Sequence, residues 1–409
     1  MVLKNDTITF YEGKQLSRNK VFSLLIKPVG STCNLRCRYC YYLDKSQLYD
    51  GKEHIMDDKL LEETIRLYIE TNESDEINFC WHGGEPLLAG LDFYKKAIDF
   101  QQKYANGKQI SNSLQTNGTL VNNDWAKFFN DNQFLIGVSI DGPKEIHDAF
   151  RKDTRGNDSW ESTVRGIEKL YRNNVEYNTL STINHYSENK GLEIYQFLKK
   201  CGSNYMQFLP VVEHINKQTR RIASPFDTES ELAQWSVKPT AFGEFMCDIF
   251  DEWVKHDVGQ VFVQLFDATL AKYIGASPGI CIFDDTCGDN LIIEHNGDIY
   301  VCDHFVYQEF KLGNLKQNSM DEILNSKARF DFKMGKRRNL SQECLDCKFN
   351  FACTGECPKH RFQNGKNALC EGYKMFYEHT EPYFKFMANE LNAGRAPSNV
   401  MKTNTFNQQ

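Results

Sequence analysis

A short loop with three cysteines constrains this chain more than any other stretch of its sequence. Cys33, Cys37 and Cys40 follow a Cys-x3-Cys-x2-Cys spacing. Three thiolates this close together can bind three irons of a four-iron cluster and leave the fourth iron open to a small molecule, whereas a fully ligated cluster mainly transfers electrons. A structural zinc site is the alternative. Zinc sites are usually closed by a fourth Cys or His, and none follows within the loop.

The segments around this loop predict an α/β fold. Apolar, β-prone runs predict strands over residues 21–27, 76–81, 110–116, 134–140, 176–183 and 204–210. Helical patterns between them predict helices over residues 57–72, 91–105, 122–132, 160–174 and 188–200. Strand–helix units in series imply a parallel sheet with right-handed crossovers, which we expect to curve into a partial (β/α)6 TIM-like barrel. The cysteine loop follows the first strand, at the edge where α/β proteins place their chemistry.

Cysteines become dense again in the second half of the chain. Their spacing is Cys281-x5-Cys287-x14-Cys302, then Cys344-x2-Cys347-x5-Cys353-x3-Cys357-x12-Cys370. Eight ligands suit two fully ligated four-iron clusters, although Cys-x2-Cys also suits zinc. We therefore expect a barrel over residues 1–240, a cysteine-rich iron–sulfur domain over 241–378 in which metal replaces a conventional core, and a helix end with a polar tail over 379–409, disordered from Asn392.

Charge and hydropathy narrow the range of partners. The net charge of −7 provides no basic footprint for nucleic acid, and no apolar run approaches membrane-spanning length. No charged-then-apolar leader opens the sequence. Fourteen cysteines in such a chain indicate metal or redox chemistry rather than disulfides. We expect a cytoplasmic monomer with no nucleic-acid or membrane partner.

Polar motifs follow the predicted strands. Trp81-His-Gly-Gly-Glu-Pro86 places two glycines where backbone can approach a zwitterionic ligand, although an ordinary tight turn is equally consistent with it. Gln115, Thr116 and Asn117 follow the third strand and offer polar groups or a helix cap. Beyond the fourth strand, Asp141 could cap a turn.

Arg151 lies in the loop after that strand. Its guanidinium is a fork of donors suited to a carboxylate, and a surface ion pair is the alternative. Within the cysteine-rich half, Asp303 directly follows Cys302 and could accept a proton there. His304 is a rival base with a suitable ordinary pKa, and a solvated Asp303 or a turn cap is the third interpretation.

The cysteine loop, with Tyr39 and Tyr42 around Cys40, resembles the radical S-adenosylmethionine (SAM) enzymes. In that family SAM chelates the open iron, and one electron cleaves it into methionine and a 5′-deoxyadenosyl radical. The resemblance implies that Gly84 contacts the SAM amino group, and it makes Glu85 a further candidate for this contact. Some relatives carry an amide where this chain has His82, which leaves that contact open.

The same resemblance implies further contacts with SAM. It places Ser139 on the ribose and Arg151 on the carboxylate, and it makes Tyr39 and Leu209 the lining of the adenine pocket. Without the resemblance, Leu209 would simply be a core residue. Tyr42 is a candidate substrate contact or a packed aromatic residue.

The cysteine-rich half resembles the SPASM domain, a twin-cluster extension of radical SAM enzymes that modify peptides. The resemblance sorts the ligands into two auxiliary clusters: Cys281, Cys287, Cys302 and Cys357 in one, and Cys344, Cys347, Cys353 and Cys370 in the other. It also selects Asp303 as the catalytic base.

As a set, the motifs from about Leu24 to Cys370 resemble the anaerobic sulfatase-maturating enzymes of anaerobic gut bacteria. The resemblance implies SAM and three [4Fe–4S] clusters as cofactors. It also implies an unfolded or nascent sulfatase polypeptide with Cys/Ser-x-Pro-x-Arg as substrate, and a flavodoxin- or ferredoxin-like electron donor. The product is Cα-formylglycine: the radical takes hydrogen from Cβ, Asp303 takes a proton, and an auxiliary cluster takes an electron.

Two other functional classes remain open at this point. Another radical SAM peptide modifier, such as a thioether-forming enzyme, would share both domains but would retain the cysteine sulfur in a new bond. A zinc-stabilised or cluster-bearing interaction module or redox sensor would cleave no SAM.

Overall fold

The computed structural model describes residues 9, 12–13, 20–49, 54–225, 227–362 and 364–403. The chain forms two compact units, each assembled from segments that are distant in sequence. The first unit contains residues 1–32, 45–113 and 286–338, and the second contains residues 33–44, 114–285 and 339–409. The domain boundaries after residues 240 and 378 stay a prediction.

The first unit is built on a mixed sheet with strand order β12-β11-β10-β1-β2-β3. Its strands are β1 (Ser23–Lys27), β2 (Glu76–Trp81), β10 (Asn290–Glu294), β11 (Asp298–Tyr300), β12 (Lys311–Asn314) and the start of β3 (Gln109–Thr116). β1 pairs in parallel with both β2 and β10, and β11 and β12 are added antiparallel. The strand after the predicted barrel, β10, therefore lies directly beside the first strand of the chain.

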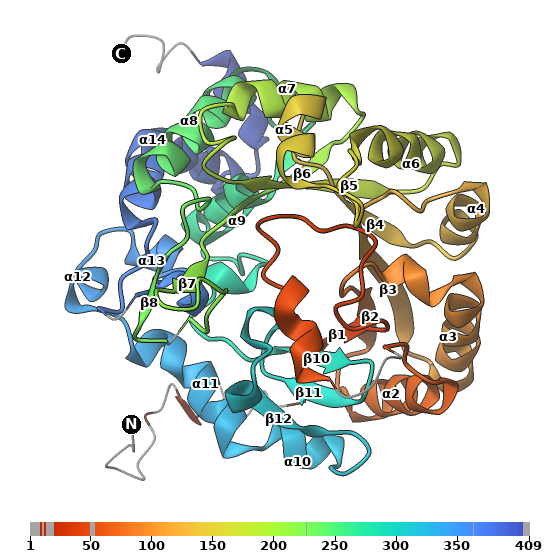
Figure 1. Cartoon of the computed structure of the whole chain (residues 1–409). Coiled ribbons are helices and arrows are strands. Elements are labelled where there is room, and N and C mark those ends of the chain that lie inside the picture. Colours follow the sequence, from red (N-terminus) through yellow and green to blue (C-terminus); the bar gives the residue numbers. More distant parts are fainter. Residues whose placement is uncertain are drawn as a thin grey trace. The chain divides into compact units, whose positions relative to one another are not determined.

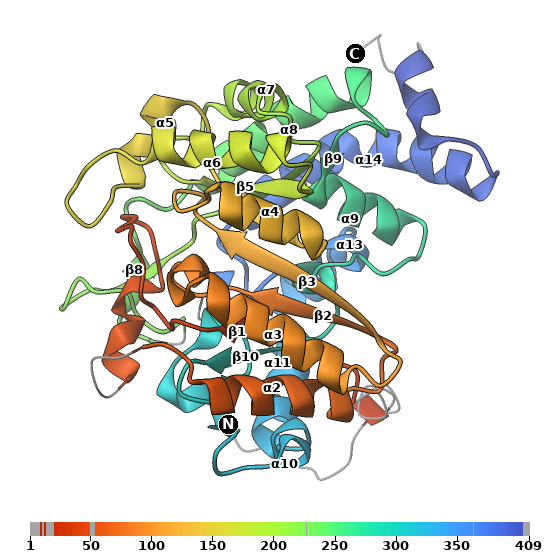
Figure 2. The ribbon, with the colours of Figure 1, turned by 90° about the vertical axis from the view of Figure 1, so that its right-hand side faces the viewer.

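Helices and single turns complete the first unit. They are α2 (Asp58–Thr71), η2 (Pro86–Ala89), α3 (Leu91–Tyr104), η4 (Asp303–Phe305), η5 (Gln308–Phe310), α10 (Met320–Leu324) and α11 (Lys327–Arg338). Figure 2 shows α2 and α3 side by side. α2 begins where the sequence predicts, because the Asp57 side chain accepts a hydrogen bond from the Leu60 amide and caps its first turn. The short helix η1 (Leu43–Leu48) joins this unit to the cysteine loop.

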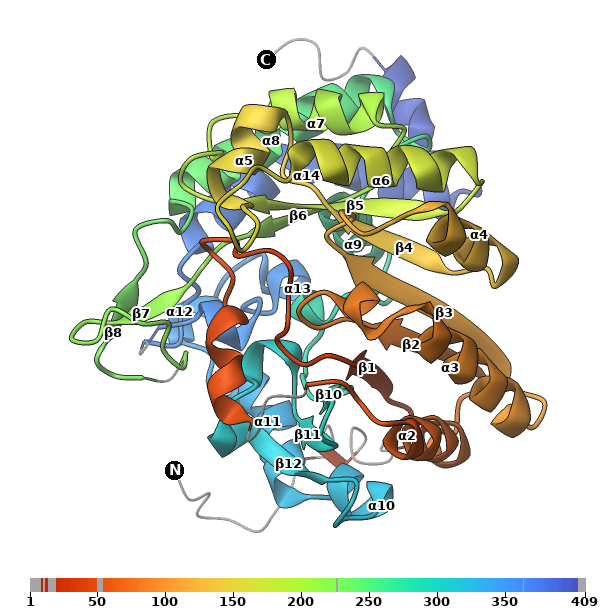
Figure 3. The same cartoon turned by 45° about the vertical axis from the view of Figure 1, so that its right-hand side comes forward.

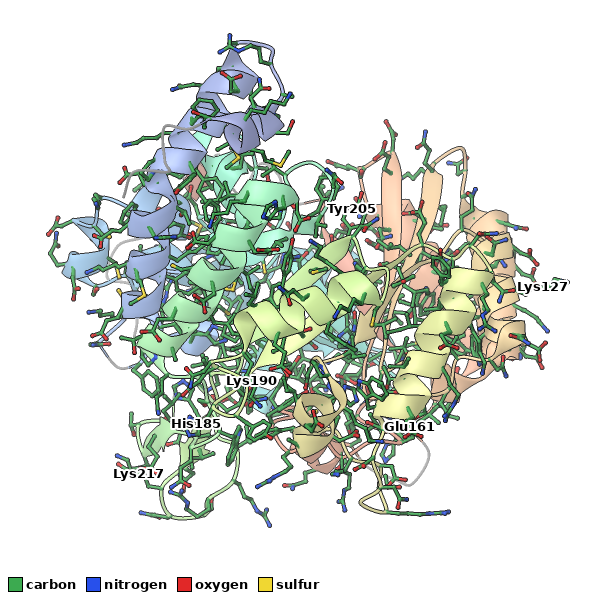
Figure 4. All side chains as sticks on the ribbon, turned by 90° about the horizontal axis from the view of Figure 1, so that it is seen from above. Lys127, Glu161, His185, Lys190, Tyr205 and Lys217 are labelled. Atoms are coloured by element: carbon green, nitrogen blue, oxygen red, sulfur yellow. The ribbon has the colours of Figure 1, made fainter. Side chains whose placement is uncertain are left out.

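The second unit is built on strands in the order β3-β4-β5-β6-β9, with the end of β3 as its first member. Its further strands are β4 (Leu135–Ser139), β5 (Tyr177–Ile183), β6 (Tyr205–Pro210), β9 (Phe262–Val263) and the hairpin β7 (His214–Asn216) and β8 (Ser230–Leu232). β4, β5, β6 and β9 are parallel. Figure 4 shows Tyr205, which begins β6, and His185, which follows β5, at opposite ends of these strands. The alternation predicts the parallel α/β arrangement correctly.

Helices flank the strands of the second unit. They are α4 (Asn123–Asp131), α5 (Lys144–Phe150), α6 (Trp160–Arg172), α7 (Gly191–Lys200), α8 (Pro239–His256), α9 (Gln264–Tyr273), η3 (Cys281–Phe283), α12 (Gln342–Leu345), α13 (Asn350–Cys353), η6 (Pro358–His360), α14 (Cys370–Asn392) and η7 (Pro397–Lys402). Figure 3 shows α4 and α6 side by side next to β4 and β5. In the described ranges, no helix is both long and apolar enough to cross a membrane.

For the C-terminal part of the chain, the sequence predicts a loop-rich region stabilised by metal and followed by a disordered tail. The structure instead contains the long helix α14 there. Helix α14 packs along α8 (Figure 1), with Phe376 and Phe384 of α14 fully buried. The disorder predicted from Asn392 is wrong for the described residues up to 403, because η7 packs on α14 and buries Val400. Because this segment is mostly polar in composition, its sequence gives little sign that Val400 is buried. Residues 404–409 lie outside the described residues.

The crossing of α8 and α14 depends on glycine, and this gives a first prediction. A Cβ at Gly372 would lie 2.1 Å from the Pro239 carbonyl oxygen, which is backbone and cannot move alone. We expect Gly372→Ala to lower the free energy of unfolding by about 1–3 kcal/mol, although Gly-to-Ala inside a helix normally stabilises by about 0.5–1 kcal/mol. The thermal unfolding midpoint of the anaerobic protein measures the change.

A matched control separates the clash from the backbone effect. Gly394 has a φ of +70°, but a Cβ added there would meet no heavy atom within 4 Å. Gly394→Ala should therefore carry only the cost of its left-handed backbone, about 1–2 kcal/mol. An unfolding midpoint for Gly372→Ala at or above the wild-type value would contradict the close helix contact.

Candidate cofactor and cluster sites

The three-cysteine loop of the second unit is held by backbone pairing with the segment that follows α5. The Arg36 amide donates to the Lys152 carbonyl at 2.7 Å, and the Arg38 amide donates to the Phe150 carbonyl at 3.0 Å. Leu35 forms an antiparallel bridge with Asp153. The loop therefore lies beside Arg151, one of the predicted SAM-binding residues.

The cysteines themselves are partly buried. The Cys33 sulfur accepts a hydrogen bond from the Leu35 amide at 3.3 Å, and the Cys40 amide donates to the Cys37 carbonyl at 3.0 Å. Burial raises the pKa of the Cys37 thiol to about 12, with the neighbouring Cys40 adding to the rise and Arg151 opposing it. A thiolate in such a place needs a nearby cation, which iron ligation would provide.

The end of β3 supports the same loop. The Asn117 amide donates to the Asn34 side-chain oxygen at 2.9 Å, and Asn34 in turn donates to Thr119 at 2.8 Å. Asn117 also accepts from the Thr119 amide at 3.0 Å and closes the turn after β3. Asn122 caps the helix that follows, so the helix cap expected of this motif is wrong, and its contact with a ligand stays a prediction.

Tyr39, Asp141 and Arg151 form a buried polar cluster in the second unit. The Tyr39 hydroxyl donates to Asp141 Oδ2 at 2.5 Å, and Arg151 Nε lies 3.0 Å from the same oxygen. The Thr182 amide donates to Asp141 Oδ1 at 3.1 Å. The Tyr39 ring stacks on Phe150, with 5.6 Å between ring centroids. Asp141 thus anchors two predicted SAM-binding residues rather than merely capping its own turn.

Electrostatics keeps this cluster in a single charge state. Burial raises the pKa of Tyr39 well above its usual value, so its hydroxyl stays neutral. Burial alone would raise the pKa of Asp141, but the Arg151 guanidinium outweighs it and lowers that pKa. Arg151 contacts Asp141 through Nε, and a guanidinium has further donors that suit a second carboxylate, such as that of SAM.

Two more predicted SAM-binding residues lie on strands of the second unit. Ser139 ends β4, and its hydroxyl accepts a hydrogen bond from the Gln115 amide at 2.9 Å. Leu209 lies near the end of β6 and is 38% exposed. An apolar strand residue with this exposure is not a core residue, and it can contact an apolar group such as adenine.

Gly84 lies in the first unit, directly after β2. Its amide donates to the Gly30 carbonyl at 2.8 Å, and the Glu85 amide donates to the Thr32 carbonyl at 2.8 Å. The Glu85 side chain accepts from the Leu87 amide and caps η2. The glycine-rich turn is therefore pressed against the backbone that leads into the cysteine loop.

Gly84 gives a second prediction. A Cβ at this position would lie 2.0 Å from the Thr32 carbonyl oxygen, so Gly84→Ala must displace one of two backbone segments. An overpacking cost of about 1–3 kcal/mol should weaken SAM binding about tenfold or more. Anaerobic equilibrium dialysis with labelled SAM measures the affinity. Gly107→Ala is the control, because it has a φ of +82° but no neighbour within 4 Å; equal losses for both variants would argue against a role for Gly84.

Asp303 begins η4 of the first unit and forms an ion pair with Lys27, the last residue of β1. The Lys27 side chain is only 1% exposed. Burial alone would raise the pKa of Asp303, but Lys27 outweighs it, with His82 and His304 nearby, and holds that pKa well below its usual range. Asp303 is therefore ionised and can accept a proton, although its pairing makes it a weaker base than a free carboxylate.

Lys27 is the residue of this site that sequence reasoning missed. Its signal was a lysine at the end of an otherwise apolar strand, Val21-Phe-Ser-Leu-Leu-Ile-Lys27. A buried lysine needs an anion, but nothing in the sequence shows which of the many carboxylates is its partner.

Four of the eight C-terminal cysteines line one small cavity of about 30 Å³ in the second unit. The cavity is bounded by Cys344, Cys347, Cys353 and Cys370, together with Phe349, Tyr373 and Tyr377 among others. Four cysteine thiols around one cavity are the donor set of a fully ligated four-iron cluster, and the same donor set also suits zinc.

The other four cysteines are distributed over both units. Cys281 and Cys357 belong to the second unit, whereas Cys287 and Cys302 belong to the first. Within the second unit, the Thr354 hydroxyl donates to the Asp284 carbonyl at 3.2 Å, which joins the turn after Cys281 to the segment before Cys357. The grouping of these four as ligands of one cluster stays a prediction.

Comparison with known proteins adds independent evidence. Residues 28–198 match the model of the radical SAM superfamily, and residues 285–348 match SPASM, an iron–sulfur cluster-binding domain. A serine-type anaerobic sulfatase-maturating enzyme of Bacteroides thetaiotaomicron is 44% identical over 94% of this chain and 95% of its own length. A cysteine-type enzyme of Clostridium novyi is 35% identical over 91% of this chain and 98% of its own length.

A solved structure agrees with the sequence comparison. Native anSMEcpe with bound AdoMet is 32% identical, with a TM-score of 0.80 over 90% of this chain and 99% of its own. The α/β fold, the radical SAM domain and the SPASM domain expected from the sequence are thus confirmed. The chain belongs to the anaerobic sulfatase-maturating enzymes, a formylglycine-generating family of radical SAM oxidoreductases.

Proposed function

We propose that this enzyme oxidises a Cys or Ser residue of a sulfatase polypeptide, in a Cys/Ser-x-Pro-x-Arg context, to Cα-formylglycine. The observation that carries the proposed mechanism is the ion pair between the buried Lys27 and the partly exposed Asp303, which directly follows Cys302. This pair places an ionised carboxylate next to a predicted cluster ligand, where a proton and an electron must leave the substrate together.

The cofactors supply the radical and redox chemistry, and the side chains of this chain position them. When bound, SAM and the three proposed [4Fe–4S] clusters would supply the 5′-deoxyadenosyl radical that removes hydrogen from Cβ, and would take up the electron that the substrate loses. Cys33, Cys37 and Cys40 would hold the first cluster. Tyr39, Gly84, Ser139, Arg151 and Leu209 would hold SAM.

Asp303 acts as general base in this proposal. It accepts the proton from the oxygen or sulfur of the target residue as the aldehyde or thioaldehyde forms. The Lys27 ammonium keeps the carboxylate ionised and oriented before substrate arrives. A thioaldehyde then hydrolyses to the aldehyde with loss of the sulfur.

Serine is the favoured target residue. The Bacteroides relative named as serine-type is 44% identical, whereas the Clostridium novyi relative named as cysteine-type is 35% identical. A solved relative, anSMEcpe, carries a bound Kp18Cys peptide, which supports an unfolded peptide segment as the substrate. We further propose a flavodoxin- or ferredoxin-like electron donor, a cytoplasmic location and a monomeric enzyme.

The test is an anaerobic assay with two peptides. Reconstituted protein, SAM and a reductant are mixed with a Ser-x-Pro-x-Arg peptide or a Cys-x-Pro-x-Arg peptide, and an aldehyde-reactive probe is read by mass spectrometry. We expect aldehyde on both peptides and a higher yield from the serine peptide. SAM cleavage without aldehyde on either peptide would reject the substrate and favour another peptide modification, such as a thioether crosslink.

A further inference from the structure

The short link between Cys353 and Cys357 has an uncommon backbone. Its three residues, Thr354, Gly355 and Glu356, have φ values of +49°, +73° and +52°. Residues other than glycine rarely adopt this left-handed region, and each such residue costs about 1–2 kcal/mol. Two consecutive predicted cluster ligands are thus joined by a segment that does not hold its shape by intrinsic preference.

Arg361 holds this link in place. Its Nε donates to the Gly355 carbonyl at 2.8 Å, and its Nη2 donates to the Thr354 carbonyl at 3.2 Å and the Glu356 carbonyl at 3.0 Å. The Arg361 side chain is buried, with the residue only 6% exposed. One guanidinium therefore gathers three consecutive carbonyl oxygens on one side of the link.

The space around Gly355 is too small for a side chain. A Cβ at this position would lie 2.8 Å from Arg361 Nη2 and 2.2 Å from a Leu340 methyl carbon. The Glu356 side chain is fixed as well, because it accepts from the Asn367 amide and lies 2.8 Å from His360 Nδ1. The link is thus fixed on both sides by buried polar groups.

The carbonyl contacts also place a buried positive charge beside a predicted cluster ligand. The guanidinium hydrogen-bonds to the carbonyls of Thr354 and Gly355, the two residues that directly follow Cys353. A buried positive charge close to a cluster stabilises the reduced form of the cluster and thereby raises its reduction potential.

We propose that Arg361 is a positioning residue for the auxiliary cluster of Cys344, Cys347, Cys353 and Cys370. It fixes the link and holds a buried positive charge beside Cys353, and it thereby raises the reduction potential of this cluster so that the cluster readily accepts an electron. The inference rests on the cluster assignment of the proposed function, but it needs neither the sulfatase substrate nor SAM.

The test measures the cluster without turnover. Arg361→Gln and Arg361→Lys are prepared in a background with Cys33, Cys37 and Cys40 all replaced by alanine, so that only auxiliary clusters remain. Iron content, the electron paramagnetic resonance spectrum of the reduced clusters, and their midpoint potentials are recorded under anaerobic conditions. Arg395→Gln is the matched control, because Arg395 pairs with Glu390 near the end of α14 that lies opposite Cys370.

We expect Arg361→Gln to retain iron and to lower one of the two midpoint potentials by about 59 mV, equal to a tenfold change for one electron. Arg361→Lys keeps the positive charge but loses the fork of donors, so its midpoint potential should lie between those of Arg361→Gln and the wild-type protein. It also carries the test if Arg361→Gln does not fold. Unchanged potentials and spectra in iron-loaded Arg361 variants would overturn the proposal, whereas absence of cluster iron from the parent protein would overturn the cluster assignment itself.

Discussion

Asp303→Asn is expected to cleave SAM as well as wild type while forming about 10²–10⁴-fold less aldehyde, the usual contribution of a general base. Asparagine has nearly the same shape as aspartate but cannot take the substrate proton. The cofactor-binding residues proposed above do not include Asp303, so radical formation should continue. The measurement is 5′-deoxyadenosine and aldehyde from the same anaerobic reaction, expressed as a ratio.

The neighbouring histidine provides the control for this prediction. His304 is the rival base in the sequence and lies next to Asp303 in η4. His304→Gln should retain most aldehyde formation if Asp303 accepts the proton. A full aldehyde yield from Asp303→Asn, or a collapse confined to His304→Gln, would transfer the role to the histidine.

Asp141→Ala has the second large effect that we expect. It removes the carboxylate that accepts from the Tyr39 hydroxyl and the Thr182 amide and that pairs with Arg151. The side chains of both charged partners are almost fully buried, at 0% exposure for Asp141 and 8% for Arg151. Removing one member of a buried pair typically costs about 3–5 kcal/mol, because the other charge stays buried without its partner. The unfolding midpoint should fall, and SAM should bind more weakly.

A double variant tests the physical reason. Asp141→Ala combined with Arg151→Met removes both charges, and replacing a whole buried pair by apolar groups is often close to neutral for stability. We therefore expect the double variant to be more stable than Asp141→Ala alone, while still binding SAM poorly. If the double variant instead loses as much stability as Asp141→Ala and Arg151→Met lose in sum, the ion pair is not what stabilises this cluster.

The sequence predicts the regular part of the fold well, for an identifiable reason. The strands over 21–27 and 204–210, like those between them, agree with the structure to within two residues at each end. Most of these strands alternate buried residues with partly or fully exposed ones, and this period of two is the pattern that indicates a strand. α5 was missed because it has only seven residues and begins directly after Pro143 in a motif read for its ligand contacts.

The sequence predicts the site only in part, because some of its contacts join residues that are distant in the chain. Cysteine spacing indicates cluster chemistry because ligands in one loop are close by covalent connection. Lys27 and Asp303 are brought together only by the pairing of β1 with β10, and no local pattern encodes that contact. Likewise, Asp141 looks like a turn cap until the cysteine loop brings Tyr39 onto it.

The position of β1 between β2 and β10 also affects how the protein folds during synthesis and whether a fragment of it can be expressed alone. During synthesis, β1 emerges early but obtains its second neighbour only after most of the chain has been translated. Until then its edge offers unpaired backbone groups to other chains. Such long-range parallel pairing slows folding, so the nascent enzyme should depend on chaperones. A fragment cut before β10 would keep that exposed edge permanently, and the radical SAM part should therefore aggregate when it is expressed alone.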